Sequence, residues 1–167
     1  MSRLVLIGAP GAGKSTVGKA LSEKLNRVFL DTDVLIQDST GKTITDIFVV
    51  DGEEVFRAIE LKVLADVLKS VNTVISLGGG APISEQAQKL ILDSQSLVIF
   101  LDVSLATAAP RVGFNRDRPL LLGNPRTQWQ ALSDKRRPIY ERLADVAIKV
   151  DEMDVDAIVT AIVKEAK

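Results

Sequence analysis

The chain has 167 residues, of which 46% are hydrophobic and 26% charged, proportions typical of a globular protein with one domain. It has no histidine and no cysteine, which excludes disulfides, the usual zinc sites and Cys–His or Ser–His nucleophilic pairs. The net charge of −1 gives no general attraction to nucleic acid or membranes, and no stretch reaches the ~20 apolar residues that span a bilayer. We therefore expect a cytoplasmic protein with no nucleic-acid or membrane partner, and any metal to be a hard cation on oxygen ligands.

Short runs rich in β-branched residues alternate with longer helical patterns, which is typical of an α/β fold with a parallel sheet between two helical layers. The predicted strands are 3–7, 27–30, 73–77, 97–101 and 146–150. The predicted helices are 13–25, 33–39, 44–49, 53–70, 85–92, 105–112, 126–143 and 155–166. Pro138 is expected to end or kink the helix 126–143. Segment 113–123 has glycine at both ends and no clean period, and it is predicted to be a mobile loop.

The strongest motif is the phosphate loop at residues 8–15, which reads Gly-Ala-Pro-Gly-Ala-Gly-Lys-Ser and matches GxxxxGK[ST] in full. A predicted strand leads into it and a periodic helix leads out, so an ordinary glycine-rich turn is disfavoured. Backbone N–H groups of such a loop surround phosphates, Lys14 adds a positive charge for the β- and γ-phosphates, and Ser15 offers its hydroxyl directly to Mg²⁺. The predicted triphosphate contacts here are Gly11, Ala12, Gly13, Lys14, Ser15 and Thr16.

Two acidic residues follow the second predicted strand. Asp31 and Asp33 lie at its carboxyl end, the edge at which ligands bind in open α/β sheets. One carboxylate could support hydrated Mg²⁺ and the other could accept the proton of an attacking hydroxyl. Capping of the next helix is an equally good interpretation. The third predicted strand ends in the glycine run 78–80, which lacks a magnesium-binding aspartate and exposes backbone for close approach by a ligand.

Seven of the ten arginines lie between positions 111 and 142. A solvated helix face with scattered ion pairs is one interpretation of this segment. The other is an anion-handling lid, because the predicted loop 113–123 lies inside it. Composition alone leaves both open.

An ordered series of motifs resembles the shikimate kinase family over roughly residues 4–150. Besides the phosphate loop it comprises Asp-Thr-Asp at 31–33, Gly-Lys-x-Ile-x-Asp-Ile-Phe at 41–48, Gly-Glu-x-x-Phe-Arg-x-x-Glu at 52–60, Leu-Gly-Gly-Gly at 77–80, Arg-Pro-Leu-Leu at 118–121 and Arg-x-Pro-x-Tyr at 136–140. The resemblance implies a three-layer αβα P-loop fold with a five-stranded parallel sheet of order 2-3-1-4-5. It implies one kinase domain over residues 1–167, with a substrate-binding region at about 32–60 and a mobile lid at about 112–124.

The implied reaction is transfer of the γ-phosphoryl group from ATP, with Mg²⁺, to the 3-hydroxyl of shikimate. By resemblance, Asp33 is the base and contacts the substrate, while Asp31 supports Mg²⁺ through a water molecule. Arg57 and Arg136 hold the shikimate carboxylate, since guanidinium groups pair bidentately with carboxylates. Further substrate-site and nucleotide contacts are implied for Gly79, Gly80, Lys14, Arg111 and Arg118.

Among these, Arg118 is expected to reach the transferring phosphoryl group from the lid, sharing charge stabilisation with Lys14. Arg111 is expected to pack on the adenine. After the fifth predicted strand this chain is acidic, reading Asp-Glu-Met-Asp-Val-Asp at 151–156, where the family often has a basic residue. We therefore expect nucleotide selectivity that is looser, or that comes from backbone groups. Trp129 and Tyr140 are interpreted as packing residues.

Two alternatives are weighed. A gluconate-type small-molecule kinase shares the phosphate loop and an early acidic motif, but lacks Phe-Arg at 56–57 and Arg-Pro-Leu-Leu at 118–121. A non-catalytic nucleotide-binding module would be expected to have lost Lys14, Asp33 or Arg118, and all three are present. We expect the chain to act as a monomer.

Overall fold

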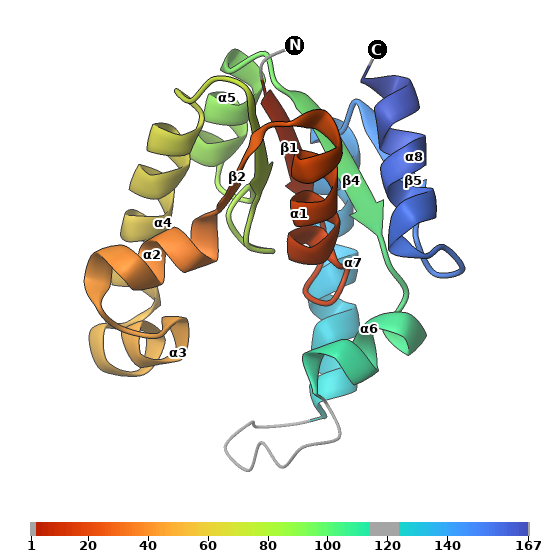
Figure 1. Cartoon of the computed structure of the whole chain (residues 1–167). Coiled ribbons are helices and arrows are strands. Elements are labelled where there is room, and N and C mark those ends of the chain that lie inside the picture. The colour runs from red at the N-terminus through yellow and green to blue at the C-terminus, as the bar shows by residue number, and fades with distance from the viewer. Residues whose placement is uncertain (1–2, 114–123, 167) are drawn as a thin grey trace.

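The computed structural model describes residues 3–113 and 124–166 and contains one five-stranded parallel sheet (Figure 1). The order is β2-β3-β1-β4-β5, which confirms the predicted topology. Central strand β1 pairs with β3 through Leu4 and Val74, and with β4 through Leu4 and Leu97. The strands are β1 (Arg3–Ile7), β2 (Val28–Asp31), β3 (Thr73–Ser76), β4 (Leu97–Asp102) and β5 (Val146–Lys149).

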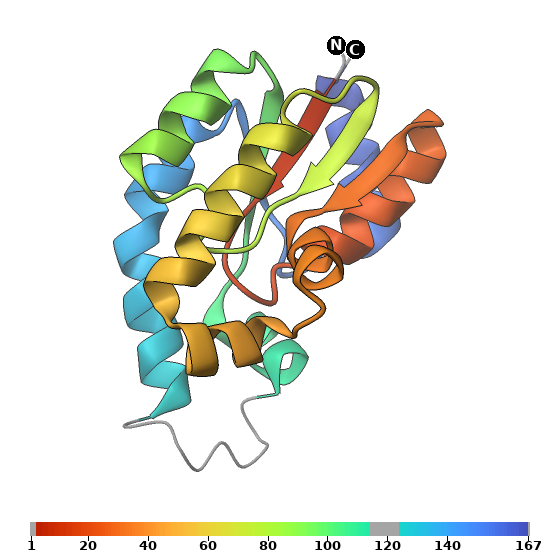
Figure 2. The same ribbon diagram turned by 90° about the vertical axis from the view of Figure 1, so that its left-hand side faces the viewer.

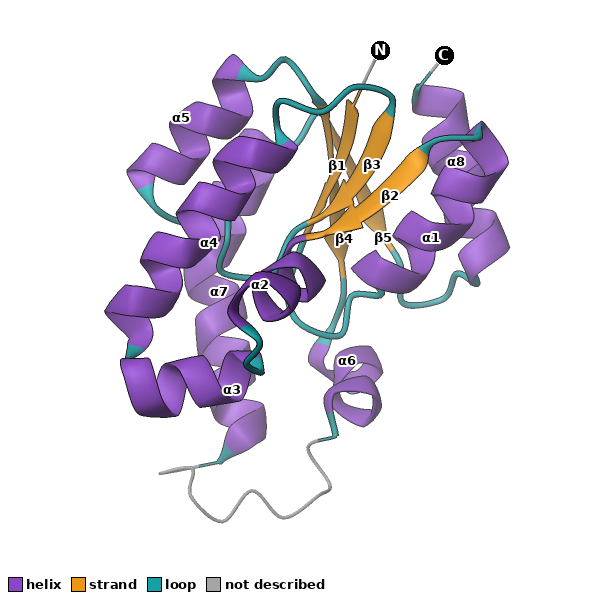
Figure 3. Ribbon diagram, turned by 60° about the vertical axis from the view of Figure 1, so that its left-hand side comes forward, coloured by secondary structure: helices purple, strands orange, loops and turns teal. Residues whose placement is uncertain are grey.

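Helices cover both faces of this sheet, as Figure 3 shows. One layer contains α1 and α8, and the other contains α4, α5 and α7. The helical segments are α1 (Lys14–Leu25), α2 (Thr32–Thr40), α3 (Ile44–Asp46), η1 (Ile47–Asp51), α4 (Glu53–Val67), α5 (Glu85–Asp93), α6 (Leu105–Val112), α7 (Pro125–Leu143) and α8 (Val155–Glu165). Among the residues described, no helix is long and apolar enough to cross a membrane.

The alternation of side chains along β1 explains the three layers. Leu4 and Leu6 are buried in the core beside α1 and α8, whereas Val5 and Ile7 are buried in the core beside α4, α5 and α7. Successive residues of a strand point to opposite faces, so a central strand between two helical layers must be apolar throughout. The run Leu-Val-Leu-Ile satisfies this and delivers the chain to the phosphate loop.

The segment from α2 to the start of α4 projects beyond the carboxyl edge of the sheet (Figure 2). It has a small core of its own, formed by Ile36, Ile47 and Phe56. The predicted helix 44–49 is instead the short α3 followed by the π-helix η1. The predicted helix 53–70 ends at Val67.

Pro138 was predicted to end or kink its helix; the helix does not end there, because α7 continues through Pro138 to Leu143. Pro138 lies on the exposed side of α7, where water can solvate the carbonyl that its missing N–H leaves unpaired. Asn124 caps α7 by accepting a hydrogen bond from the Arg126 N–H at 2.9 Å, with Pro125 at the first helical position. Residues 114–123 of the predicted lid at about 112–124, with Arg118, lie outside the described residues.

Candidate active site

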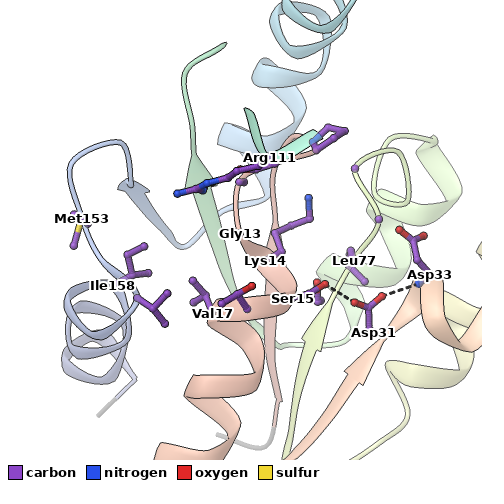
Figure 4. Close-up of a pocket in the computed structure, with 18 of the residues that line it drawn as sticks. Gly13, Lys14, Ser15, Val17, Asp31, Asp33, Leu77, Arg111, Met153 and Ile158 are labelled. Atoms are coloured by element: carbon purple, nitrogen blue, oxygen red, sulfur yellow. Dashed lines mark hydrogen bonds between the residues drawn. The ribbon is translucent and has the colours of Figure 1, made fainter. Parts of the chain in front are cut away.

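A cleft of about 690 Å³ lies at the carboxyl edge of the sheet (Figure 4). The phosphate loop and the start of α1 line its middle. Met153 and Ile158 lie at one end, and Asp31 and Asp33 at the other. The topology requires this arrangement, since the loops after β1, β2 and β3 leave the sheet at the same edge.

The phosphate loop has a backbone that only glycine tolerates at two critical positions. Gly8 has φ of 149°, and a Cβ there would lie 2.6 Å from the carbonyl oxygen of Leu101. Gly13 has φ of 90° and directly precedes Lys14, the first residue of α1. The predicted contacts Gly11, Ala12, Lys14, Ser15 and Thr16 all line the same cleft with Gly13. The loop therefore turns its backbone around the amino end of α1, where the helix dipole favours an anion.

Lys14 is buried at the base of this loop. Its Nζ donates hydrogen bonds to the carbonyl oxygens of Gly8 at 2.6 Å and Ala9 at 3.0 Å. Burial lowers the pKa of Lys14 to about 8, and the carboxylates of Asp33 and Asp31 offset part of that effect. The ammonium group is therefore poorly solvated and is well placed to gain from an added anion.

The Asp31 carboxylate makes hydrogen bonds in two directions. Its Oδ1 accepts hydrogen bonds from the N–H groups of Asp33 at 3.0 Å and Val34 at 3.3 Å, so the capping interpretation is confirmed. Its Oδ2 accepts the Ser15 hydroxyl at 2.5 Å. One carboxylate thus fixes the start of α2 and still presents an oxygen beside the phosphate loop (Figure 4).

Asp33 lies in the first turn of α2 and its carboxylate contacts the glycine run. Burial raises the pKa of Asp33, and the neighbouring Asp31 carboxylate raises it further. Lys14 and Arg57 act in the opposite direction. A partly desolvated carboxylate with a raised pKa is a suitable proton acceptor near neutral pH.

Each glycine of the run 78–80 faces a different functional side chain. A Cβ at Gly78 would lie 2.6 Å from Asp33 Oδ1, and one at Gly80 would lie 2.4 Å from Arg57 Nη1. A Cβ at Gly79 would lie 3.3 Å from Arg136 Nη1 and 3.1 Å from Pro10 Cδ. The absence of side chains therefore lets a carboxylate and both predicted guanidinium groups converge on one short segment.

Arg57 is held in place by its neighbours on α4 and η1. Its Nη1 donates to Glu60 Oε1 at 2.7 Å, and its guanidinium lies 5.2 Å and 5.8 Å from the ring centres of Phe56 and Phe48. Glu60 is 4% exposed; burial raises its pKa, and Arg57 counteracts this. Sequence reasoning did not identify Glu60 as a site residue, although its i,i+3 spacing from Arg57 on a helix is a readable signal.

Helix α7 contacts the loops of the site through residues that were predicted only to pack. Trp129 and Tyr140 are buried, which confirms packing, but each also makes a hydrogen bond. Trp129 Nε1 donates to the carbonyl of Pro10 at 3.0 Å, and the Tyr140 hydroxyl donates to the carbonyl of Gly79 at 2.6 Å. One helix therefore fastens both the phosphate loop and the glycine run.

The arginines of the segment 111–142 have separate environments. Arg111 donates to the carbonyl of Gly11 at 3.0 Å and lines the cleft opposite Met153. Arg137 forms a bidentate pair with Asp102 at 2.7 and 2.8 Å, which raises the pKa of Arg137. Arg137 makes ion pairs of the kind that the solvated-face interpretation includes, and the pair with Asp102 ties α7 to the end of β4.

The acidic segment after β5 is engaged locally. Asp151 accepts hydrogen bonds from the Ser104 N–H at 2.9 Å and hydroxyl at 2.7 Å, which lower the pKa of Asp151. Asp154 caps α8 through the Ala157 N–H at 2.8 Å. The carboxylates thus order this segment, while Met153 and Val155 present apolar surface to the cleft.

A phosphate loop on a sheet of order 2-3-1-4-5, with a carboxylate and two arginines beside it, places the chain in the class of P-loop small-molecule kinases. The family model described as shikimate kinase matches residues 10–167. The shikimate kinase of Thermobifida fusca is 48% identical over 161 residues, which cover 96% of this chain and 92% of that relative. The solved shikimate kinase of Acinetobacter baumannii, in complex with shikimate, superposes with a TM-score of 0.92 at 31% identity, covering 99% of this chain and 93% of that one. The chain belongs to the shikimate kinase family.

Proposed function

We propose that the chain transfers the γ-phosphoryl group of ATP to the 3-hydroxyl of shikimate, giving shikimate 3-phosphate and ADP. The observation that carries this proposal is the convergence of Asp33, Arg57 and Arg136 on the glycine run, next to the phosphate loop. A base and two guanidinium groups at one site match a substrate that has both hydroxyl groups and a carboxylate.

The phosphate loop is proposed to hold the triphosphate. Its backbone N–H groups and the amino end of α1 surround the phosphates, and the Lys14 ammonium neutralises charge on the β- and γ-phosphates. Arg111 and the apolar surface of Met153 and Ile158 lie where the base of the nucleotide would extend from the loop. On the basis of its sequence motif, Arg118 is proposed to supply a second positive charge to the transferring phosphoryl group.

The residues present fit Mg²⁺ bound together with the nucleotide. Ser15 and Asp31 bring a hydroxyl and a carboxylate oxygen to within 2.5 Å of each other beside the loop. Among the described residues there is no group of three or more acidic side chains that could hold a metal alone. Mg²⁺ commonly binds through one or two protein oxygens, with water and phosphate completing its shell, and it would neutralise phosphate charge there. Ser15 would bind it directly and Asp31 through water.

Asp33 is proposed to accept the proton of the attacking hydroxyl. Its raised pKa and its position between the phosphate loop and the glycine run support this role. Arg57 and Arg136 would hold the shikimate carboxylate, with Gly79 and Gly80 allowing the substrate to lie against backbone. This orientation would present one hydroxyl group to Asp33 and keep the carboxylate away from it.

A coupled assay of ADP release with ATP and Mg²⁺ tests the proposal against a panel of shikimate, quinate and gluconate. We expect turnover with shikimate far above the ATP hydrolysis measured without an acceptor. Activity on gluconate alone would establish the gluconate-type alternative. ATP binding without turnover of any acceptor would establish the non-catalytic module.

A further inference from the structure

Side chains from two different elements fasten the glycine run. The hydroxyl oxygen of Thr32, in the first turn of α2, accepts the Gly78 N–H at 3.0 Å. The Tyr140 hydroxyl on α7 donates to the Gly79 carbonyl at 2.6 Å. Both side chains are buried, Thr32 at 0% and Tyr140 at 1% exposure, so neither bond competes with bulk water.

Thr32 provides the next hydrogen-bond acceptor after the backbone hydrogen bonds between β3 and β1 end. The Leu77 N–H donates to the Leu6 carbonyl at 3.1 Å, and the next amide along the chain, that of Gly78, is the one that Thr32 accepts. A buried amide without a partner is energetically unfavourable, so this bond strongly favours one position of the Gly78 backbone. That position lies against the carboxylate of Asp33, the neighbour of Thr32 in sequence.

Tyr140 holds the next residue of the glycine run, Gly79. It lies one helical turn after Arg136 on α7, and the Arg136 guanidinium lies against Gly79. The bond from Tyr140 therefore fixes the distance between Arg136 and the glycine run. The two hydroxyl groups hold the run at Asp33 on one side and at Arg136 on the other.

We propose that Thr32 and Tyr140 are positioning residues that hold the glycine run as a rigid spacer between the acceptor base and the carboxylate-binding arginine. This inference rests on the proposed phosphoryl transfer. Misplacement by about 1 Å can reduce turnover about 100-fold, so a loose spacer would matter even with every contacting residue present. The two fastenings have different consequences, because Thr32 controls the surroundings of Asp33 and Tyr140 controls those of Arg136.

The first test compares Thr32→Val with Thr32→Ser. Valine has nearly the same shape but cannot accept the Gly78 N–H, whereas serine can. We expect Thr32→Val to lower kcat roughly 10- to 100-fold with the KM for ATP within about twofold, and Thr32→Ser to retain kcat within about threefold. Tyr140→Phe should instead raise the KM for shikimate with a smaller effect on kcat.

Thr73→Val is the matched control. Thr73 is also buried, at 3% exposure, and its hydroxyl bonds to that of Ser70 at 2.8 Å, but it lies at the opposite edge of the sheet. It should lower the melting temperature without changing kcat or either KM. Equal effects of Thr32→Val and Thr73→Val on kcat would overturn the proposal.

Hydrogen exchange of the Gly78 amide tests the fastening without any substrate. We expect exchange at least about tenfold faster in Thr32→Val than in wild type and Thr32→Ser. Unchanged exchange would also overturn the proposal. Failure of the proposed function is distinguishable, because wild-type protein itself would then leave shikimate unphosphorylated.

Discussion

Replacing Gly80 by alanine tests the placement of Arg57 without altering Arg57 itself. The new Cβ would lie 2.4 Å from Nη1 and 2.7 Å from Nη2 of the guanidinium, well inside any real contact distance. The guanidinium cannot swing away easily, because Glu60 accepts its Nη1 at 2.7 Å and the rings of Phe48 and Phe56 lie within 5.8 Å. Alanine must therefore displace the group that is proposed to bind the substrate carboxylate.

The size of the effect follows from that displacement. The guanidinium must retreat by about 1 Å to reach ordinary van der Waals separation of roughly 3.5 Å. Such a shift removes the geometry needed for a charge-assisted pair with the carboxylate, which contributes about 1.5–3 kcal/mol. We therefore expect the KM for shikimate to rise about 10- to 150-fold, with the KM for ATP within about twofold.

Steady-state kinetics with each substrate varied in turn would measure both constants. Thr73→Val is again the control, because Thr73 is buried at the opposite edge of the sheet. It should lower the melting temperature and leave both KM values unchanged. An unchanged KM for shikimate in Gly80→Ala, or a rise in the KM for ATP alone, would refute the placement of Arg57.

Further predictions concern the carboxylates and Lys14. Asp33→Asn should bind ATP normally and lose about 10²–10⁴ in turnover; normal turnover would remove Asp33 as the base. Asp31→Asn keeps an oxygen that can cap α2 and should mainly raise the Mg²⁺ requirement, whereas Asp31→Ala should also lower the free energy of unfolding by ~1 kcal/mol; equal stability of the two variants would contradict the capping role. The value of kcat/KM for ATP should fall as pH rises through about 8, where Lys14 loses its charge because burial lowers its pKa to that value; a flat profile there would contradict the burial argument. On the acid side, kcat should fall as Asp33 is protonated, with its inflection above the ordinary value of 3.8; an inflection at or below that value would show that Asp33 is solvated.

Local rules predicted most of the fold. β-Branched runs gave all five strands to within a residue or two at each end, and a strand–loop–helix motif located the phosphate loop. These features depend on residues close in sequence, so they can be predicted without knowledge of the tertiary structure. The same rules left an end or a kink open at Pro138, and the helix does not end at this exposed position.

The hydrogen bonds between elements that are distant in sequence could not be predicted in this way. Thr32 meets Gly78 across 46 positions, and Trp129 meets Pro10 across 119. From the sequence such residues can be predicted only to be buried or to lie in turns. Their hydrogen-bond partners depend on how the helices and loops pack in three dimensions. Asp31 shows the same limit: its cap of α2 was one of the predicted alternatives, but its hydrogen bond from Ser15 becomes visible only in the structure.

The most direct test of the proposed phosphoryl transfer is product identification by ³¹P and ¹H NMR after incubation with ATP, Mg²⁺ and shikimate. We expect a new phosphomonoester coupled to the proton at carbon 3 of shikimate, formed in the same amount as ADP. Release of inorganic phosphate equal to ADP, with shikimate unchanged, would contradict it, since the cleft would then hydrolyse ATP without transferring the phosphoryl group.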